Sequence, residues 1–355
     1  MKLKIQYILI ICMLLCTGCG GRTNESAKAS SEEGVQEDTP SATKDFFAMD
    51  TYMEVTAYGE QAEEAVSQAQ ARVEELDSML STGLEDSEVS LLNSNAKGTL
   101  SEETFYLMTR SMDIWKITDG SFNPAIYPLM ELWGFTTGDY QVPEEEEVRE
   151  KLADTNPEDI QLYEDTRKVA FARKGIKIDF GGIAKGYTSA QIMEIFKEYG
   201  IESGMVSLGG NVQVLGCKTD GSLWRVGIQN PDSEEGYLGV LETKDRAVIT
   251  SGGYERYFEQ DGETYHHILD PETGYPAENR LKSVTIVSKD GVLADGLSTA
   301  LFVMGPEKAK KFWMNSGDDF DVILWTEEQK MYVSEGIEDS FDTDYDMEVI
   351  RKDGK

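Results

Sequence analysis

An acid, two glycines and a lysine follow an apolar run that ends at Ile178. The segment reads Asp179-Phe-Gly-Gly-Ile-Ala-Lys-Gly186, which is typical of a strand, a tight turn and the first turn of a helix. A helix start offers unpaired N–H groups and a positive dipole end, which suit a phosphate. Because Lys185 precedes glycine, the segment is not a Walker A loop. Taken alone, it is explained at least as well by a plain glycine turn.

A carboxylate and a hydroxyl recur on one helix face further along the chain. In Ala294-Asp-Gly-Leu-Ser-Thr-Ala300, Asp295 and Thr299 are four residues apart and therefore share a face. With a nearby backbone carbonyl they would form a hard oxygen ligand set suited to Mg²⁺ and a bound phosphate. The alternative is an aspartate that only interacts with the helix dipole.

Both histidines of the chain are adjacent, at His266 and His267. Neighbouring side chains on a strand point to opposite faces, so a two-histidine metal site is disfavoured. His267 is a candidate acid–base group, although a plain surface histidine fits the spacing equally well. Just upstream, Thr250-Ser-Gly-Gly-Tyr-Glu-Arg256 places a glycine turn after a strand, with Arg256 supplying charge. Since no G-x-S-x-G elbow surrounds Ser251, a hydrolase triad is not expected.

The elements that must position these residues follow from the apolar periodicity. Helical spacing predicts helices over 60–80, 101–117, 143–153, 184–199, 293–304 and 307–315, and 81–95 has the composition of a polar loop. Alternating or short apolar runs predict strands over 46–58, 160–163, 169–172, 176–178, 205–208, 212–215, 224–228, 237–243, 247–250, 254–258, 282–287, 322–325 and 331–333. Because most strands follow one another directly, we expect an α+β fold with a largely antiparallel sheet and packed helices.

The N-terminus has the pattern of a bacterial lipoprotein. Residues 1–18 combine a basic start with a short apolar run, and they precede Cys19, the expected site of acylation. The alternative is an ordinary cleaved signal with an incidental cysteine. Residues 19–43 are polar and acidic, which predicts a disordered tether. We expect one folded domain over 44–340 and an acidic C-terminal tail over 341–355.

Charge argues against two classes of partner. The formal net charge is −33, which argues against binding to nucleic acid and against adsorption to anionic lipid. Membrane attachment is therefore expected through the lipid on Cys19. Only Cys217 lies in the folded body, so no internal disulfide is expected there.

Taken together, the motifs resemble the FAD:protein FMN transferase family, the ApbE-type flavin transferases. The resemblance covers about residues 46–325, and its motifs come in the family's order. They are Met49-Asp-Thr51, Ser121-Phe-Asn-Pro124, Asp179-Phe-Gly-Gly-Ile-Ala-Lys-Gly186, Leu208-Gly-Gly-Asn211, Val226-Gly-Ile-Gln-Asn-Pro231, Thr250-Ser-Gly-Gly-Tyr-Glu-Arg256, His267-Ile-Leu-Asp-Pro-Glu-Thr-Gly274 and Ala294-Asp-Gly-Leu-Ser-Thr-Ala300.

The resemblance implies a T-fold-like architecture and a Mg²⁺-dependent enzyme outside the cytoplasm. Such an enzyme takes FAD, moves its FMN half onto a Ser or Thr hydroxyl of an acceptor protein, and releases AMP. It implies flavin contacts at Met49, Ser121, Phe122, Asn123, Asp179, Lys185, His267 and Leu269. It implies metal ligands at the carbonyl of Gly182 and at Asp295, Ser298 and Thr299. The acceptor hydroxyl needs a base, for which His267 is the candidate and Asp179 the alternative.

The chain departs from the family pattern at two glycines. Gly83 stands where relatives often have an aromatic residue that packs on the flavin, and Gly253 stands where Asp is common. Two other functions use the same residues: an FAD pyrophosphatase that gives FMN and AMP, and a lipoprotein that binds FAD without turnover. The family implies membrane redox-pump subunits or extracytoplasmic electron-transfer flavoproteins as acceptors.

Overall fold

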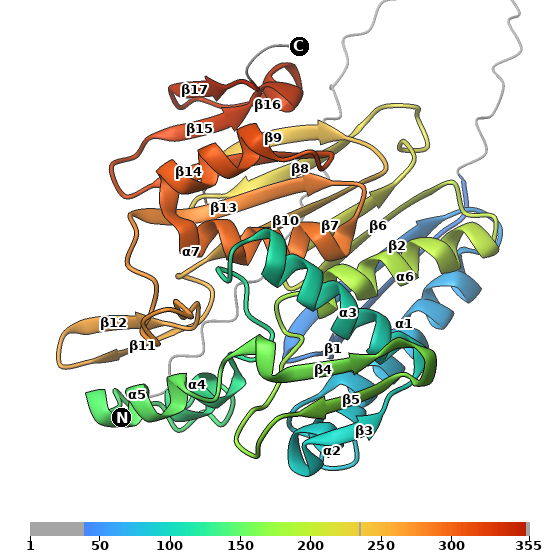
Figure 1. Ribbon diagram of the computed structural model, residues 1–355. Helices are drawn as coiled ribbons and strands as arrows, with labels where there is room; N and C mark the ends of the chain where they lie inside the picture. Colours follow the sequence, from blue (N-terminus) through green and yellow to red (C-terminus); the bar gives the residue numbers. More distant parts are fainter. Residues whose placement is uncertain (1–38, 234–235, 353–355) are drawn as a thin grey trace, which may run out of the picture.

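The computed structural model describes residues 39–233 and 236–352, so the predicted signal peptide, Cys19 and most of the tether lie outside the described residues. A nine-stranded sheet runs through the molecule (Figure 1). Every neighbouring pair in it is antiparallel except the last, which is parallel. Its spatial order is β1 (Ser41–Ala48), β2 (Thr51–Tyr58), β6 (Ser203–Leu208), β7 (Asn211–Leu215), β10 (Arg246–Gly252), β13 (Leu281–Ser288), β14 (Phe320–Thr326), β15 (Met331–Ser334) and β17 (Met347–Ile350).

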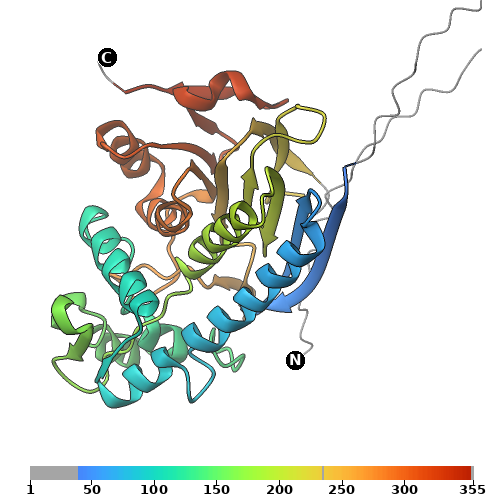
Figure 2. The ribbon, with the colours of Figure 1, turned by 90° about the vertical axis from the view of Figure 1, so that its right-hand side faces the viewer.

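Alternating side chains of the central strands enter two different cores. Ile249 and Ile286 pack on one face with α7 (Gly291–Asn315), whereas Val248 and Val287 pack on the other. This is the period of two that a strand imposes. Helices α1 (Ala62–Leu80), α6 (Ala184–Glu198) and α7 cover the first face (Figure 2). A small sheet of β8 (Trp224–Gln229), β9 (Tyr237–Thr243) and β16 (Phe341–Asp342) covers the second.

The remaining elements surround the ends of these helices. They are α2 (Glu88–Asn95), α3 (Glu102–Ile117), α4 (Tyr127–Leu132), α5 (Glu145–Leu152), the sheet of β3 (Lys97–Thr99), β5 (Lys168–Phe171) and β4 (Ile160–Tyr163), the hairpin of β11 (Tyr257–Gln260) and β12 (Glu263–His266), and the 3₁₀ turns at Pro157–Asp159, Glu164–Thr166 and Glu335–Ser340. The expected α+β class with a largely antiparallel sheet is confirmed. No helix within 39–233 or 236–352 combines the length and the apolar character that crossing a bilayer needs.

Two domain boundaries differ from the sequence prediction. The first strand begins at Ser41, inside the predicted tether of 19–43. The predicted acidic tail of 341–355 contributes two strands, with Phe341 and Ile350 buried. Acidic residues alternate there with apolar ones, so the acids point outward while the apolar side chains join the core. The folded domain therefore includes most of the residues predicted as a tail.

Two local predictions were also wrong. Residues 88–95, predicted as part of a polar loop, form α2, which begins at a Ser87 side chain that accepts a hydrogen bond from the Ser90 N–H (2.9 Å). Residues 176–178 were predicted as a strand but join no sheet. There the Asn93 side chain bonds both the N–H (2.8 Å) and the carbonyl (2.9 Å) of Ile178, in place of a neighbouring strand.

Candidate active site

The starts of α6 and α7 lie against each other at two glycines. A Cβ on Gly186 would stand 2.1 Å from the carbonyl oxygen of Gly291, and one on Gly291 would stand 2.6 Å from that of Gly186. Only glycine permits this backbone approach. It brings the first turn of α6 next to Asp295, one turn into α7.

Asp295 is a buried carboxylate held by neutral donors. One of its oxygens accepts from the Gly186 N–H (2.8 Å) and the other from Asn211 Nδ2 (3.1 Å). Burial raises the pKa of Asp295, while the charge of Lys185 and these hydrogen bonds lower it. The N–H groups at the start of α6, predicted to face a phosphate, thus point in part at Asp295. The close approach of the two helices explains this difference.

Three hydroxyls continue the site from Asp295. Ser251, near the end of β10, lies 2.7 Å from the Ser298 hydroxyl and 3.4 Å from that of Thr299. Ser298 is fully buried and donates to the Asp295 main-chain carbonyl (2.7 Å). Thr299 is only partly buried. Of the two predicted hydroxyl ligands, Thr299 is therefore the more accessible to a bound ion.

This donor set fits Mg²⁺. Within the described residues no cluster of three or more His, Cys, Asp or Glu side chains could hold a metal. The site offers one buried carboxylate, that of Asp295, with hydroxyls beside it. Magnesium is commonly held by one or two carboxylates together with substrate phosphates and water, because it gives up its waters reluctantly. Asp295 and Thr299 would hold the ion, with the Gly182 carbonyl as the third predicted ligand.

The segment before α6 packs on the loop before α4. The Asp179 N–H donates to the carbonyl of Pro124 (2.9 Å), and the Asp179 carboxylate accepts from the Gly181 N–H. A Cβ on Gly182 would stand 2.9 Å from the Phe122 ring, so Phe122 lies directly on this glycine. The predicted contacts Ser121, Phe122 and Asn123 are thereby placed beside Asp179 and Gly182.

Asn123 holds this loop in shape. Its Nδ2 donates to the carbonyl of Thr155 (2.8 Å), and its Oδ1 accepts from the Ala125 N–H (2.8 Å). Both ends of its amide are therefore engaged within the protein. These two hydrogen bonds fix the main chain next to Phe122.

His267 lies opposite Arg256 where the β11–β12 hairpin begins. The carbonyl of Arg256 accepts from the His267 N–H (3.0 Å) and lies 3.1 Å from Nδ1 of the ring. Burial lowers the pKa of His267 to about 3, with further lowering by the charges of Arg256, His266 and Lys185. The imidazole is therefore neutral near pH 7. With Nδ1–H donating to the carbonyl, Nε2 keeps a free lone pair.

Lys185 links the charged groups of the site. Its charge lowers the pKa of Asp179, Glu255, His267 and Asp295, so all four groups lie within electrostatic range of Lys185. For all four, burial is the largest influence. The pKa of Glu255 is raised to about 7 by desolvation, and the exposed position of the residue limits that desolvation. Glu255 was not predicted as a site residue, because nothing in its spacing distinguishes it from surface glutamates.

Two predicted flavin contacts, Met49 and Leu269, lie in different parts of the structure. Met49 lies in the β1–β2 turn with a positive φ of 48°, and its sulfur is 3.8 Å from the Thr188 hydroxyl of α6. Leu269 is buried in an apolar cluster with Trp133 and Phe135. A contact between Leu269 and a ligand would therefore be made by its main chain.

Gly253 lies against His266, whose Cδ2 would be 2.7 Å from an added Cβ.

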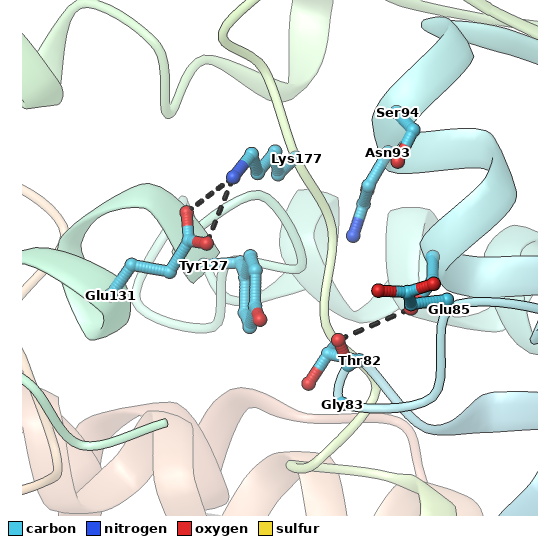
Figure 3. A pocket seen from close by; sticks show the side chains of 9 residues that line it. Thr82, Gly83, Glu85, Asn93, Ser94, Tyr127, Glu131 and Lys177 are labelled. Carbon is cyan, nitrogen blue, oxygen red and sulfur yellow. Dashed lines mark hydrogen bonds and ion pairs between the residues drawn. The ribbon is translucent and has the colours of Figure 1, made fainter. Parts of the chain in front are cut away.

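A polar pocket of about 420 Å³ is lined by Lys177, Glu131 and Tyr127 on one side (Figure 3). Lys177, two residues before Asp179, reaches both carboxylate oxygens of Glu131 (2.6 and 2.8 Å) and lies 5.7 Å from the centre of the Tyr127 ring. Burial raises the pKa of Tyr127, and the charges of Glu131 and Asp179 raise it further. The remaining lining residues are Thr82, Gly83, Glu85, Ser90, Asn93 and Ser94.

This fold is that of a class of proteins already known. The profile of the ApbE family matches residues 49–324. The chain therefore belongs to the ApbE family.

Individual relatives agree with that assignment. An FAD:protein FMN transferase of Klebsiella pneumoniae is 36% identical over 237 residues, which cover 66% of this chain and 73% of the relative. One of Treponema pallidum is 29% identical over 323 residues, 85% of each chain. The crystal structure of the Thermotoga maritima ApbE protein has a TM-score of 0.79 at 33% identity, covering 84% of this chain and 98% of that one. The flavin transferase ApbE of Vibrio cholerae has a TM-score of 0.76 at 28% identity, with the same coverage.

Proposed function

We propose that this protein is an FAD:protein FMN transferase that uses Mg²⁺, attaches FMN to a Ser or Thr hydroxyl of an acceptor protein and releases AMP. Its membership of the ApbE family and its relatives' activity support the transferase. The observation that carries the site is the α6–α7 junction, where two glycines let a buried carboxylate and adjacent hydroxyls meet beside Lys185.

The reaction is one phosphoryl substitution. The acceptor oxygen forms a bond to the phosphorus of the FMN half, and the bond from that phosphorus to the oxygen of the AMP phosphate breaks. The proton of the acceptor hydroxyl passes to a base, for which Nε2 of the neutral His267, oriented by the Arg256 carbonyl, is the candidate and the Asp179 carboxylate, whose pKa burial raises, is the alternative. AMP leaves with the electron pair on its phosphate oxygen. Magnesium, when bound, neutralises charge on the phosphates.

The pocket lined by Lys177 and Tyr127 is proposed to receive the flavin ring system. Its volume of about 420 Å³ is within the range of small-molecule sites. Gly83 forms part of its wall, and Lys177, two residues before Asp179, forms another part. Because Gly83 has no side chain, the buried ring of Tyr127 is the aromatic surface that the pocket offers.

The site is also proposed to work outside the cytoplasm. The pattern of residues 1–18 and Cys19 supports a lipid-anchored protein on the extracytoplasmic face of the bacterial membrane. An acceptor there would be a redox-pump subunit or an electron-transfer flavoprotein. Radiolabelled fatty acid, incorporated into the wild type but not into Cys19→Ser, would support the anchor, and equal labelling of both proteins would contradict it.

The function is tested with the purified soluble body, FAD, Mg²⁺ and a candidate acceptor. We expect the intact mass of the acceptor to rise by one FMN, with one AMP released per adduct, and we expect Asp295→Ala to abolish both. Asp339→Ala, which removes an exposed carboxylate far along the chain, is the matched control and should keep full activity. AMP release without an adduct on a proven acceptor would instead establish an FAD pyrophosphatase. Bound, unchanged FAD would establish a carrier.

A further inference from the structure

The β11–β12 hairpin packs between two supports. It is a separate two-stranded sheet, and such a hairpin is at most marginally stable by itself. Phe258 pairs with Tyr265 and Tyr257 with His266, so these two pairs point to opposite faces. On one face, the centres of the His266 ring and the Phe302 ring of α7 are 5.5 Å apart. On the other, the Phe258 and Tyr265 rings pack on the segment after α4, so the two supports together fix the position of the hairpin.

Phe135 lies at the centre of the second support. It is fully buried, and the centre of its ring is 5.7 Å from those of Tyr140 and Phe258. The same ring lies 6.4 Å from the imidazole of His267, with an angle of 68° between the two planes. Aromatic rings attract one another in this edge-to-face arrangement at centre distances up to about 7 Å. Phe135 therefore packs on both the hairpin and the candidate base.

The main chain of Phe135 is fixed by the end of α4. The Gly134 N–H donates to the Glu131 carbonyl (3.0 Å), and the Phe135 N–H donates to the Met130 carbonyl (3.0 Å). These are the two hydrogen bonds of a Schellman motif, in which glycine takes a positive φ, here 80°. A Cβ on Gly134 would also stand 2.1 Å from the Asp139 carbonyl oxygen. The Phe135 side chain thus starts from a rigid point, which suits it to hold another ring in place.

The imidazole of His267 needs such a second contact. The Arg256 carbonyl, 3.1 Å from Nδ1, favours the tautomer that carries its proton on Nδ1. One hydrogen bond fixes that atom only, because the torsion that turns the ring about its Cβ–Cγ bond has broad preferences. The Phe135 ring, which meets the imidazole at 68°, restricts that turn and excludes water from its side of the imidazole. The two contacts together give Nε2 a single direction.

We propose that Phe135 is a positioning residue for FMN transfer, whose ring holds the His267 imidazole so that Nε2 is aligned for the acceptor hydroxyl. The proposal rests on the proposed function with His267 as its base, and it identifies the contact that orients this base. Because Phe135 is fully buried, it is inaccessible to either substrate. Its effect on the reaction therefore passes through His267, which makes the role separable from general support of the fold.

Histidine spectra test the contact without any substrate. The chain has only two histidines, so NMR of the ¹⁵N-histidine-labelled full chain in detergent shows two imidazoles, and the one lost in His267→Gln is that of His267. In the wild type we expect a single tautomer, protonated on Nδ1, that stays uncharged at pH 5, because the pKa of His267 is about 3. In Phe135→Leu we expect a mixture of tautomers and a pKa shifted upward, toward the usual value of about 6.5, because water reaches the imidazole. Arg256, His266 and Lys185, whose charges act on His267, are unchanged in that variant.

Phe341→Leu is the matched control. Phe341 is also buried, but in the apolar cluster on the opposite face of the large sheet. The substitution removes the same ring atoms, and it should leave the spectra of both histidines and the rate of AMP release unchanged.

Kinetics test whether the contact acts through the base. With a proven acceptor and Mg²⁺, we expect Phe135→Leu to lower kcat for AMP release about 10-fold while KM for FAD stays within about twofold, because a positioned general base contributes about 10²- to 10⁴-fold. In the His267→Gln background, Phe135→Leu should change kcat by less than about twofold, because the interaction that it supports is already absent. A purely structural role would lower kcat in both backgrounds.

Unchanged His267 spectra in Phe135→Leu would overturn the proposal, as would losses of kcat that multiply in the double variant. A His267→Gln protein with the kcat of the wild type would also overturn it, because the base would then be elsewhere. Should Phe135→Leu not fold, Phe135→Met, whose flexible side chain fills irregular space, takes its place. A wild type that transfers no FMN to a proven acceptor would refute the proposed function, and the histidine spectra, recorded without FAD, would still decide whether Phe135 fixes the imidazole.

Discussion

The close approach of α6 and α7 makes Gly186→Ala the sharpest test of the site's construction. The added methyl group would stand 2.1 Å from the Gly291 carbonyl oxygen and 2.8 Å from the Asp295 Cβ, whereas real Cβ contacts are essentially never below 3.0 Å. The helix starts would have to separate by about 0.9 Å at that point. Both obstacles are close to the backbone, so no flexible side chain can move away to relieve them.

The expected cost follows from that geometry. Overpacking a rigid contact destabilises a protein by about 1–3 kcal/mol. The separation also lengthens the 2.8 Å hydrogen bond from the Gly186 N–H to Asp295, so the carboxylate loses a donor that orients it. We therefore expect a free energy of unfolding lower by about 1–3 kcal/mol in urea titrations, and a higher Mg²⁺ concentration for half-maximal AMP release.

Gly317→Ala is the matched control, because nothing lies within 4 Å of the methyl group it adds. Its free energy of unfolding and its Mg²⁺ dependence should equal those of the wild type. If Gly186→Ala also stayed within about 0.5 kcal/mol of the wild type, with an unchanged Mg²⁺ dependence, the helix starts would not meet as described. The account of Asp295 as a ligand positioned by that junction would then be wrong.

Three further outcomes are expected. Asp295→Asn keeps an oxygen for the Gly186 N–H but turns an amide toward Asn211 Nδ2. AMP release should then need at least about tenfold more Mg²⁺, by analogy with the loss of one charged contact. Equal Mg²⁺ dependence in the variant and the wild type would argue against Asp295 as a metal ligand. Because the pKa of folded His267 is about 3 and that of an unfolded histidine about 6.5, the unfolded state binds more protons between these values. His267 therefore costs stability as the pH falls below 6.5, and His267→Gln should lose less unfolding free energy between pH 7 and 5 than the wild type; parallel curves would show that His267 is not buried and neutral. Lys177→Met leaves the Glu131 carboxylate at the pocket wall without its ion pair. It should therefore weaken riboflavin binding and leave ADP binding unchanged. Weaker ADP binding with unchanged riboflavin binding would show that the flavin ring does not bind in this pocket.

The main framework could be predicted because it depends on local periodicity. The spacing of the apolar residues in 60–80 and 184–199 predicted α1 and α6 nearly to their ends. The run of strands without intervening helices predicted an antiparallel sheet. The sequence also predicted a break between the helices at 293–304 and 307–315. In the structure this break is a kink within α7, where Gly305 has a positive φ of 74°.

Other features depend on partners that are distant in the sequence, so no local pattern could show them. Ile178 lies in an extended segment, but the Asn93 side chain takes the place of the neighbouring strand. The contact of Gly186 with Gly291 requires two helices more than 100 residues apart. Similarly, Glu255 joins the charged centre only because a turn after β10 brings it back toward Lys185. The order of the motifs identified the family, whereas these long-range contacts could be found only in the structure.

The candidate site is built from segments spread along almost the whole domain. The site combines residues from the β1–β2 turn, the loop of Phe122, the start of α6, the end of β10 and the start of α7, and β2 and β10 are three places apart in the order of the large sheet. Such non-local pairings form slowly and late in folding, because each must close a long loop. No contiguous fragment of the domain contains the whole site. Substrate binding and global folding are consequently linked, so ADP with Mg²⁺ should protect even the outer strands of the sheet from unfolding.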